Sequence, residues 1–230
     1  MYFDLLNPEN KSLVVLSGGM DSTTLLKDVR DTLHGGDPTK VWAISFDYNQ
    51  KHRKELECAI LTCRDLLVDH RIVPIPMLND LAPSALTRKD WKVPTGHYED
   101  ETMKQTVVPN RNMVMISLAV SYAINLKADY LFVGVHSGDH AIYPDCRPSF
   151  YSAMQDAIMR CDWHEILLRA PYLDIDKNKI CKRGVDLNVD YGLTWTCYEG
   201  KYLACGKCGS CVERLEAFEY AGVSDPVKYE

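Results

Sequence analysis

The run Ser17-Gly18-Gly19-Met20-Asp21-Ser22 has the residue types of an anion-binding loop. Two adjacent glycines let a backbone turn sharply and approach a ligand, and the two serines add hydroxyl donors. The apolar residues 13–16 before the run predict a buried strand, and residues 21–33 after it carry apolar side chains at helical spacing. A strand, a glycine turn and a helix N-terminus direct free N–H groups to one point, which is an arrangement that binds phosphate.

Asp21 is the unusual member of this loop, because a carboxylate beside a phosphate is repulsive unless a cation lies between them. The sequence therefore predicts that Asp21 meets Mg²⁺ carried by a nucleotide. The loop has neither the lysine of G-x-x-x-x-G-K-[ST] nor the spacing of G-x-G-x-x-G, so it belongs to neither of those fingerprints. The alternative is a structural turn with a chance pair of glycines.

The second chemical signal is a cluster of four cysteines with the spacing C-x7-C-x2-C-x2-C, formed by Cys197, Cys205, Cys208 and Cys211. Close C-x2-C turns present thiolates to one tetrahedral ion, and four cysteines leave zinc no open position. We therefore predict a structural zinc site that helps to fold the tail. An iron–sulfur cluster and a redox dithiol are the alternatives.

Arg111 stands at the start of a predicted helix, where its charge opposes the helix dipole. It is better explained by a carboxylate, a phosphate or a partner chain that it holds, although a solvated arginine is the alternative. The loop Tyr143-Pro144-Asp145-Cys146-Arg147-Pro148 combines a ring, a carboxylate and a guanidinium, and Asp145 suits the N–H edge of a guanine-like base. Equally, Asp145 and Arg147 could pair and cap the following helix, and Cys146 could be a nucleophile, although a lone thiol is more often structural.

A further polar loop contains His136, Asp139 and His140. These residue types can bind a metal, but single histidines on loops are more often solvated or hydrogen-bonded. Residues 87–106 are polar and have no clear periodicity, which predicts a mobile loop or lid.

The elements that must position these side chains alternate along the chain. Strands are predicted at residues 13–16, 41–46, 71–75, 130–135 and 166–168, and helices at about 56–67, 110–126, 148–161 and 176–188. The prolines of the third strand favour an edge position, and the helix at 110–126 is apolar nearly all round, which predicts a central place. Such alternation predicts a doubly wound, mainly parallel α/β sheet with the polar residues gathered at the carboxyl ends of its strands.

The whole chain of 230 residues fits one α/β domain of residues 1–190, with a zinc-binding segment of residues 191–230 packed on it. A net charge of −6 argues against general affinity for nucleic acid. No apolar run long enough to span a membrane and no signal-peptide pattern are present, so we expect a cytoplasmic protein.

S-G-G-x-D-S after a strand resembles the pyrophosphate loop of the ATP pyrophosphatase superfamily, whose members activate a carboxyl or carbonyl oxygen with ATP. Further motifs narrow this resemblance to the 7-cyano-7-deazaguanine synthase family, and they cover residues 13 to about 222. These motifs are S-G-G-M-D-S-T-T at 17–24, F-D-Y at 46–48, K-H-R at 51–53, V-P-N-R-N at 108–112, G-V-H at 134–136, Y-P-D-C-R at 143–147, L-T-W-T-C-Y at 193–198 and the cysteine cluster.

The resemblance implies an enzyme that converts 7-carboxy-7-deazaguanine, ammonia and ATP to the nitrile in queuosine and related biosynthesis. The carboxylate is adenylated, ammonia displaces AMP to give an amide, and a second activation dehydrates the amide. It also implies a homodimer with bound zinc and Mg²⁺, and small-molecule rather than nucleic-acid partners.

Residue by residue, the resemblance assigns ATP binding to the loop, catalysis to Asp21 and Arg111, and substrate binding to Arg111 and to the loop after the fourth strand. The ATP-binding residues are Leu16, Ser17, Gly18, Gly19, Met20, Asp21, Ser22, Thr23 and Thr24, the substrate-binding residues are Arg111, Tyr143, Asp145 and Arg147, and the zinc ligands are Cys197, Cys205, Cys208 and Cys211.

Two departures from the family pattern lie near the expected pocket: Asn49, where members often have glycine, and the loop at 137–142. An enzyme that stops at 7-amido-7-deazaguanine would show the same motifs. The motifs are also compatible with a related amide-forming or tRNA-sulfurating enzyme, or with a zinc-bearing nucleotide-binding module without catalysis. The role of Lys51, His52 and Arg53 is left open.

Overall fold

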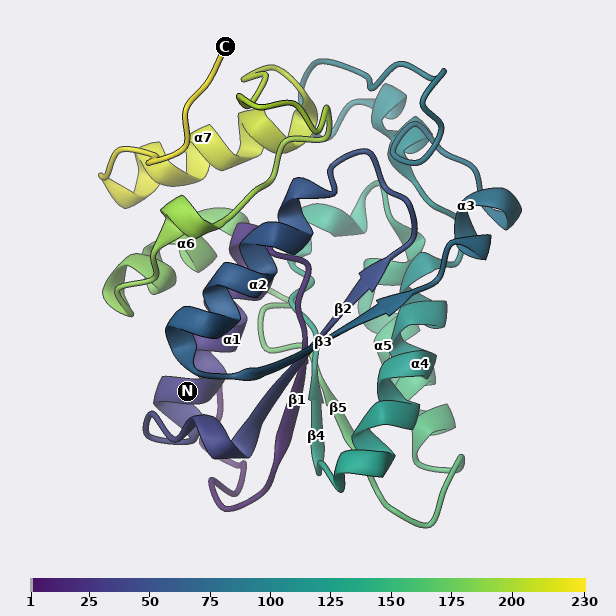
Figure 1. The fold of residues 1–230 in the computed structure, drawn as a ribbon, viewed down its shortest axis with the longest axis vertical. Coiled ribbons are helices and arrows are strands. Elements are labelled where there is room, and N and C mark those ends of the chain that lie inside the picture. Colours follow the sequence, from purple (N-terminus) through teal and green to yellow (C-terminus); the bar gives the residue numbers. More distant parts are fainter. Residues whose placement is uncertain (1) are drawn as a thin grey trace.

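The computed structural model describes residues 2–230 and shows a five-stranded parallel sheet with helices on both faces (Figure 1). The order of the strands is β3-β2-β1-β4-β5, and every neighbouring pair is parallel. The predicted doubly wound sheet is confirmed, as is the edge position of the third strand. The strands are β1 (Ser12–Val15), β2 (Val41–Asp47), β3 (Asp69–Pro74), β4 (Tyr130–Phe132) and β5 (Leu167–Arg169).

Helices α4 and α5 cover one face of the sheet, and α1, α2 and α6 lie on the other side (Figure 1). The alternation of β1 explains the two layers: Leu13 packs in the core with α4 and α5, whereas Val14 packs with Leu25 of α1 and Ala59 of α2. The helices are α1 (Met20–Asp28, continued by a π-helical turn at Val29–Leu33), α2 (Lys54–Leu66), α3 (Met77–Leu81), α4 (Arg111–Leu126), α5 (Pro148–Ile158), α6 (Lys177–Asp186) and α7 (Gly209–Ala221).

The strand order places β1 at the centre, with β2 on one side and β4 on the other. The order in which the chain adds strands reverses at this point, and a crevice opens at the carboxyl ends of β1 and β4. The loops that follow β1, β2 and β4 carry the phosphate loop, Tyr48 and His136. The topology therefore brings the predicted polar segments to one edge of the sheet.

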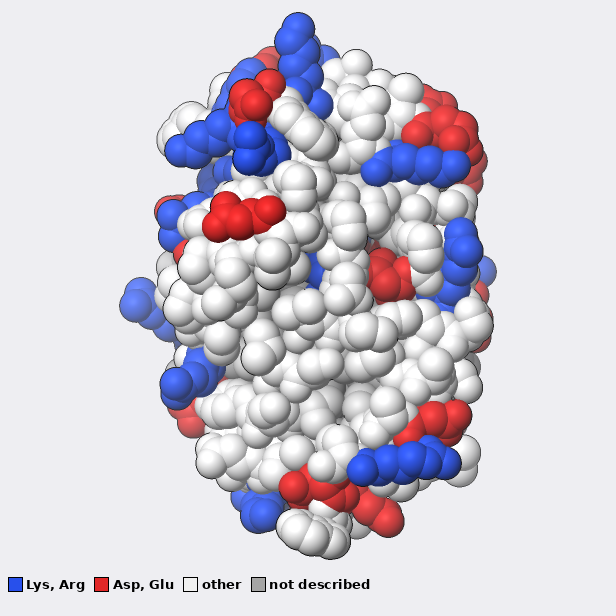
Figure 2. All heavy atoms as spheres, turned by 90° about the vertical axis from the view of Figure 1, so that its right-hand side faces the viewer, with Lys and Arg blue, Asp and Glu red and all other residues white. Residues whose placement is uncertain are grey.

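The prediction that α4 is central was wrong. Ile116, Ala119 and Ala123 of α4 are buried against the sheet, but Met113 and Leu118 on its outer side are 43% and 37% exposed. Figure 2 looks onto the side that α4 and α5 form, and much of the middle of this face is free of charged side chains. The helix is apolar all round because its outer side also lacks charged residues, and not because it is enclosed.

Residues 87–106 contain more structure than a loop. A 3₁₀ helix spans Glu101–Thr106, and the side chains of Val93, Met103 and Thr106 are buried. Whether the segment moves stays a prediction. Asn49, the departure from glycine after β2, has φ +61°, a left-handed conformation that both asparagine and glycine adopt.

The C-terminal segment packs on α1 and α6. Met20, Cys181, Tyr191 and Phe218 form one apolar cluster that crosses the proposed boundary near residue 190. Helix α7 was not predicted, because its pattern is mixed: Glu213 and Arg214 are buried, as is Phe218, whereas the apolar side chains of Leu215 and Tyr220 are exposed. No helix within residues 2–230 has the length and apolar character that a bilayer span needs.

Candidate functional site

The predicted phosphate loop connects β1 to α1 and folds on itself. Ser17 N donates to Ser22 Oγ at 3.1 Å, and Gly19 N donates to Ser17 Oγ at 3.1 Å. Gly18 has φ +91°, and a Cβ there would lie 1.9 Å from the carbonyl oxygen of Glu55, so only glycine fits. Gly19 is the N-cap of α1 and provides no side-chain cap. The N-terminal N–H groups of α1 therefore face the crevice at the positive end of the helix dipole.

The side chains within the loop segment divide into two sets. Thr24 donates its hydroxyl to Met20 O and contacts Tyr191 Oη, and both Thr24 and Met20 are fully buried. The side chains of these two residues are therefore not available to a ligand. Asp21 Oδ1 and Thr23 Oγ1 are buried and have no hydrogen-bond partner among the described residues. Such orphaned oxygens fit a site that binds a cation and a phosphate.

Behind the loop lies a cluster of ionisable side chains from separate parts of the chain. Lys177, the first residue of α6, is 7% exposed, and its Nζ lies 3.4 Å from Asp21 Oδ2 and 2.5 Å from Glu213 Oε2. His136 Nε2 lies 3.6 to 3.9 Å from carboxylate oxygens of Asp21, Asp139 and Glu213. Burial opposes the charge of Lys177, but Asp21 and Glu213 outweigh it and raise its pKa. A fixed cation therefore lies beside Asp21.

A cavity of about 240 Å³ opens beside the loop at the carboxyl ends of the central strands. Both predicted catalytic residues, Asp21 and Arg111, line it, as does Tyr143. Burial opposes the charge of Arg111, but surrounding Tyr48, Cys146 and Asp145 raise its pKa. Its Nη1 contacts Tyr48 Oη at 3.5 Å, and no carboxylate of the described residues lies within 4.0 Å of the guanidinium. A partly buried guanidinium without an ion-pair partner is suited to an anionic ligand.

The structure places the remaining predicted substrate residues differently. Tyr143 lines the cavity, and its hydroxyl contacts Thr106 Oγ1 at 2.7 Å. Asp145 Oδ2 accepts from the backbone N–H of Asn112 at 3.1 Å, so Asp145 caps α4 and does not line the cavity. Arg147 is exposed and donates to His140 O at 2.9 Å. No Asp145–Arg147 ion pair is present within 4.0 Å among residues 2–230, and substrate contact by these two residues stays a prediction.

Two buried titratable residues of the K-H-R region line the cavity without having been predicted as site residues. Burial raises the pKa of Glu55 to about 8, and burial together with nearby Arg111 lowers the pKa of His52 to about 3. Glu55 accepts from Gln50 Nε2 at 3.0 Å and lies 3.4 Å from His52 Nε2. Lys51, by contrast, donates to the carbonyl oxygen of Trp91. Of the K-H-R triplet, the histidine therefore faces the cavity.

The four buried thiols outside the cysteine cluster have no sign of activation. Cys146 lines the cavity, but it is buried and its pKa is raised. Burial likewise raises the pKa of Cys58, Cys63 and Cys181. Because the thiolate is the nucleophile, these residues are poor candidates for covalent or sulfur-transfer chemistry.

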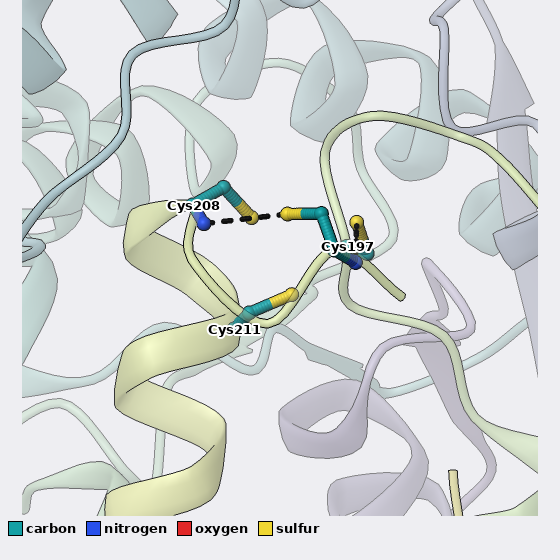
Figure 3. Close-up of side chains that lie close together, drawn as sticks. Cys197, Cys208 and Cys211 are labelled. Carbon is teal, nitrogen blue, oxygen red and sulfur yellow. Dashed lines mark hydrogen bonds between the residues drawn. The ribbon is translucent and has the colours of Figure 1, made fainter. Parts of the chain in front are cut away.

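The four clustered cysteines come together in the fold. Their sulfur atoms lie within 4.8 Å of one another, and all four residues are buried. Figure 3 shows the side chains of Cys197, Cys208 and Cys211 pointing toward one another. Hydrogen bonds from Cys208 and Cys211 lower the pKa of the Cys197 thiol, and Cys205 N also donates to Cys197 Sγ at 3.3 Å. Four converging, buried sulfurs fit a tetrahedral metal ion with no open position.

A larger cavity of about 650 Å³ lies elsewhere, between Tyr2–Pro8 and α6. Its Arg183 pairs with Asp28, and its Lys182 pairs with Asp186. It contains none of the predicted site residues, and its cations are already neutralised. Chemistry, and not size, therefore identifies the smaller cavity as the candidate site.

Lys177 and Glu213 are the principal site residues that the sequence did not reveal. In the sequence, Lys177 is one of several basic residues in the body of a predicted helix, and Glu213 lies in a helix that the pattern does not predict. Neither position carries a local signal, because the partner of each is far away in the sequence. The one hint is the Asp176 N-cap of α6, whose side chain accepts from Lys179 N and fixes where the helix starts.

Comparisons with known proteins agree with this geometry. The family described as "Queuosine biosynthesis protein QueC" matches residues 11–222. The chain is 58% identical over 220 residues to the 7-cyano-7-deazaguanine synthase of Methanoregula boonei, with 96% of this chain and 99% of the relative covered. It is also 58% identical to the 7-cyano-7-deazaguanine synthase of Caldicellulosiruptor saccharolyticus, with 96% of each covered.

Among solved structures, the fold is similar to that of the NMN synthetase from Francisella tularensis. The TM-score is 0.51 at 13% sequence identity, and the match covers 97% of this chain and 82% of the other. At this identity the likeness concerns the fold alone. The family match and the two relatives extend over nearly the whole chain, including the phosphate loop, Arg111 and the cysteine cluster. The chain therefore belongs to the queuosine biosynthesis protein QueC family.

Proposed function

We propose that this protein is a 7-cyano-7-deazaguanine synthase, an ATP-dependent carbon–nitrogen ligase of queuosine biosynthesis. It converts 7-carboxy-7-deazaguanine and ammonia to the nitrile through an amide. The observation that carries the proposal is the cavity that joins a phosphate loop to a partly buried arginine without an ion-pair partner among the described residues. Relatives that share 58% of the sequence and bear that enzyme name support it.

In the first step, an oxygen of the substrate carboxylate attacks the α-phosphorus of ATP, and pyrophosphate leaves. Arg111 holds the carboxylate, and the free N–H groups at the start of α1 bind the phosphates. Asp21, whose Oδ1 has no hydrogen-bond partner among the described residues, would hold Mg²⁺, and the ion would neutralise phosphate charge. Lys177, buried beside Asp21, adds a fixed positive charge behind the phosphate loop.

In the second step, ammonia attacks the activated carbonyl carbon, AMP leaves, and a proton is released to give the amide. The amide oxygen then attacks the α-phosphorus of a second ATP, and pyrophosphate leaves. Loss of AMP and of both protons on the nitrogen then gives the nitrile. Neither step needs a nucleophile from the protein, since ammonia and the substrate oxygen provide it. The raised pKa of the cavity thiol Cys146 agrees with this division of roles.

The cysteine cluster is assigned to structural zinc. Zinc would be held by Cys197, Cys205, Cys208 and Cys211 and would supply folding energy, not chemistry at the substrate. One zinc per chain by elemental analysis is the expected result, and iron in its place would overturn the assignment.

The protein is proposed to be a homodimer in the cytoplasm. After Arg111, α4 has no charged residue, and its outer side exposes Met113 and Leu118. An uncharged helix face of this kind is typical of a subunit interface. ATP as a substrate and four clustered thiols are consistent with a reducing compartment.

A turnover assay with 7-carboxy-7-deazaguanine, ATP, Mg²⁺ and ammonium tests the proposal, with the products identified by mass. Nitrile and AMP are the expected products. If 7-amido-7-deazaguanine were the end product, the protein would be the variant enzyme that forms the amide and does not dehydrate it. If neither 7-carboxy-7-deazaguanine nor ATP were consumed, the proposed function would be wrong.

A further inference from the structure

Lys177 is an unusual lysine, because its ammonium is almost fully buried and lies at the N-terminus of a helix. The positive end of the α6 dipole disfavours a cation there, so other groups must hold it. Two carboxylates do so, and they differ in origin. Asp21 belongs to the phosphate loop, and Glu213 belongs to α7, two residues after Cys211.

The side chain of Glu213 is held in place by the residues around it. Its side chain is 11% exposed, Oε2 lies 2.5 Å from Lys177 Nζ, and Oε1 lies 3.8 Å from His136 Nε2. A Cβ on Gly138 would come within 2.9 Å of Glu213 Oε1, so the glycine leaves the room that this carboxylate occupies. The contact to Lys177 is the shorter of the two carboxylate contacts that this lysine makes.

We infer that Glu213 is a positioning residue for ATP binding, which rests on the proposed use of the loop by ATP. Because Glu213 binds the ammonium of Lys177, this group forms no shorter ion pair with Asp21 and stays 3.4 Å from Asp21 Oδ2. Asp21 Oδ1, which has no partner among residues 2–230, is left for the cation that accompanies the phosphates. Helix α7, whose first turn carries Cys211, is through this contact a part of the ATP site.

The test is Glu213→Gln, which keeps the size of the side chain and removes its charge. We expect the affinity for Mg²⁺–ATP, measured by calorimetry, to fall about tenfold. The KM for 7-carboxy-7-deazaguanine and the amount of metal bound by the cysteine cluster should stay unchanged. The matched control is Glu216→Gln on the same helix. The side chain of Glu216 is 45% exposed, and its one ion-pair contact among the described residues, to His97 Nε2, is long at 4.0 Å. This variant should bind ATP as the parent protein does.

A double-mutant cycle with Lys177→Met separates positioning from a general structural effect. In the Lys177→Met background, Glu213→Gln should have no further effect on ATP affinity, whereas Glu213→Asp in the parent background should recover part of the loss. Additive losses, or unchanged ATP affinity in Glu213→Gln, would overturn the inference. Because ATP binding is measured without turnover, the inference can hold even if the deazaguanine substrate is wrong, and can fail while turnover to the nitrile is confirmed.

Discussion

At the scale of single residues, Arg111 is the side chain on which the proposed function depends most. Its guanidinium lines the cavity beside the phosphate loop, is partly buried, and has only a long hydrogen bond to Tyr48 among the described residues. A charge that is partly removed from water and has no ion-pair partner is costly for folding. It is retained where a ligand completes the ion pair, and a substrate carboxylate would do so.

Arg111→Met should lower kcat/KM for the carboxylate substrate by about 10²- to 10³-fold, the loss typical when one fixed charge or donor at a reaction centre is removed. Thermal stability should not fall, because no ion pair is broken. Arg111→Lys is the matched variant, and it should recover only part of the activity because it lacks the two-pronged guanidinium. Steady-state kinetics and calorimetric melting check both statements, and a destabilised but active Arg111→Met would contradict them.

Glu55 predicts a pH dependence of stability. Its pKa is about 8 in the folded protein against an ordinary value of 4.5, so between these values the folded state keeps a proton that the unfolded chain has lost. The free energy of unfolding should therefore fall as pH rises from about 5 to 8. His52, with a pKa lowered to about 3, acts oppositely and reduces stability as pH drops below about 6.5.

Comparison of the parent with Glu55→Gln isolates the Glu55 contribution, since His52 is common to both. Urea denaturation at pH 5, 6, 7 and 8 should show that the stability of the variant relative to the parent rises by about 3 kcal/mol over this range. Parallel curves would mean that Glu55 is ionised in the folded protein at neutral pH.

At the scale of elements, the C-terminal segment holds the phosphate loop in place. Trp195 N donates to Gly18 O at 2.9 Å, which ties the loop to the chain just before the cysteine cluster. Arg214 of α7 is 1% exposed and donates to Thr194 Oγ1 at 2.8 Å and to both oxygens of Asp225. The segment with the cysteine cluster and the predicted phosphate loop are therefore joined by one hydrogen-bonded network.

Arg214→Met should lower the free energy of unfolding by about 3 to 5 kcal/mol, because it leaves Asp225 buried without its partner. The double variant Arg214→Met/Asp225→Asn should recover part of this loss, since the unpaired charge is gone. Denaturant unfolding of the two variants provides the measurement. Equal losses in both would show that the charge of Asp225 is not the cause.

At the scale of the whole molecule, the two sides of the sheet differ in how they are covered. The side with α1, α6 and α7 is closed by the C-terminal segment, while the side with α4 shows an outer surface with few charges (Figure 2). The proposed dimer would use this surface. Leu118, 37% exposed near the middle of α4, is the side chain that tests it.

Leu118→Glu should convert the proposed dimer to a monomer, because two copies of the charge would be buried near the symmetry axis of an isologous interface. Light scattering after size exclusion measures the mass directly. Leu5→Glu is the control, since Leu5 is 99% exposed and lies outside α4. A parent protein that is already monomeric would refute the dimer and leave the catalytic proposal intact.

The sequence by itself determined the fold class, the phosphate loop and the cysteine cluster, because each depends on residues close together in the chain. Hydrophobic period, the glycine pair after a strand and C-x2-C spacing are local signals. The tertiary structure decided what distant segments do to one another. It placed Asp145 at the cap of α4, joined Lys177 to Glu213 beside Asp21, and turned the outer side of α4 to the surface. Those outcomes depend on burial and on contacts across many residues, and the local pattern of a chain does not record them.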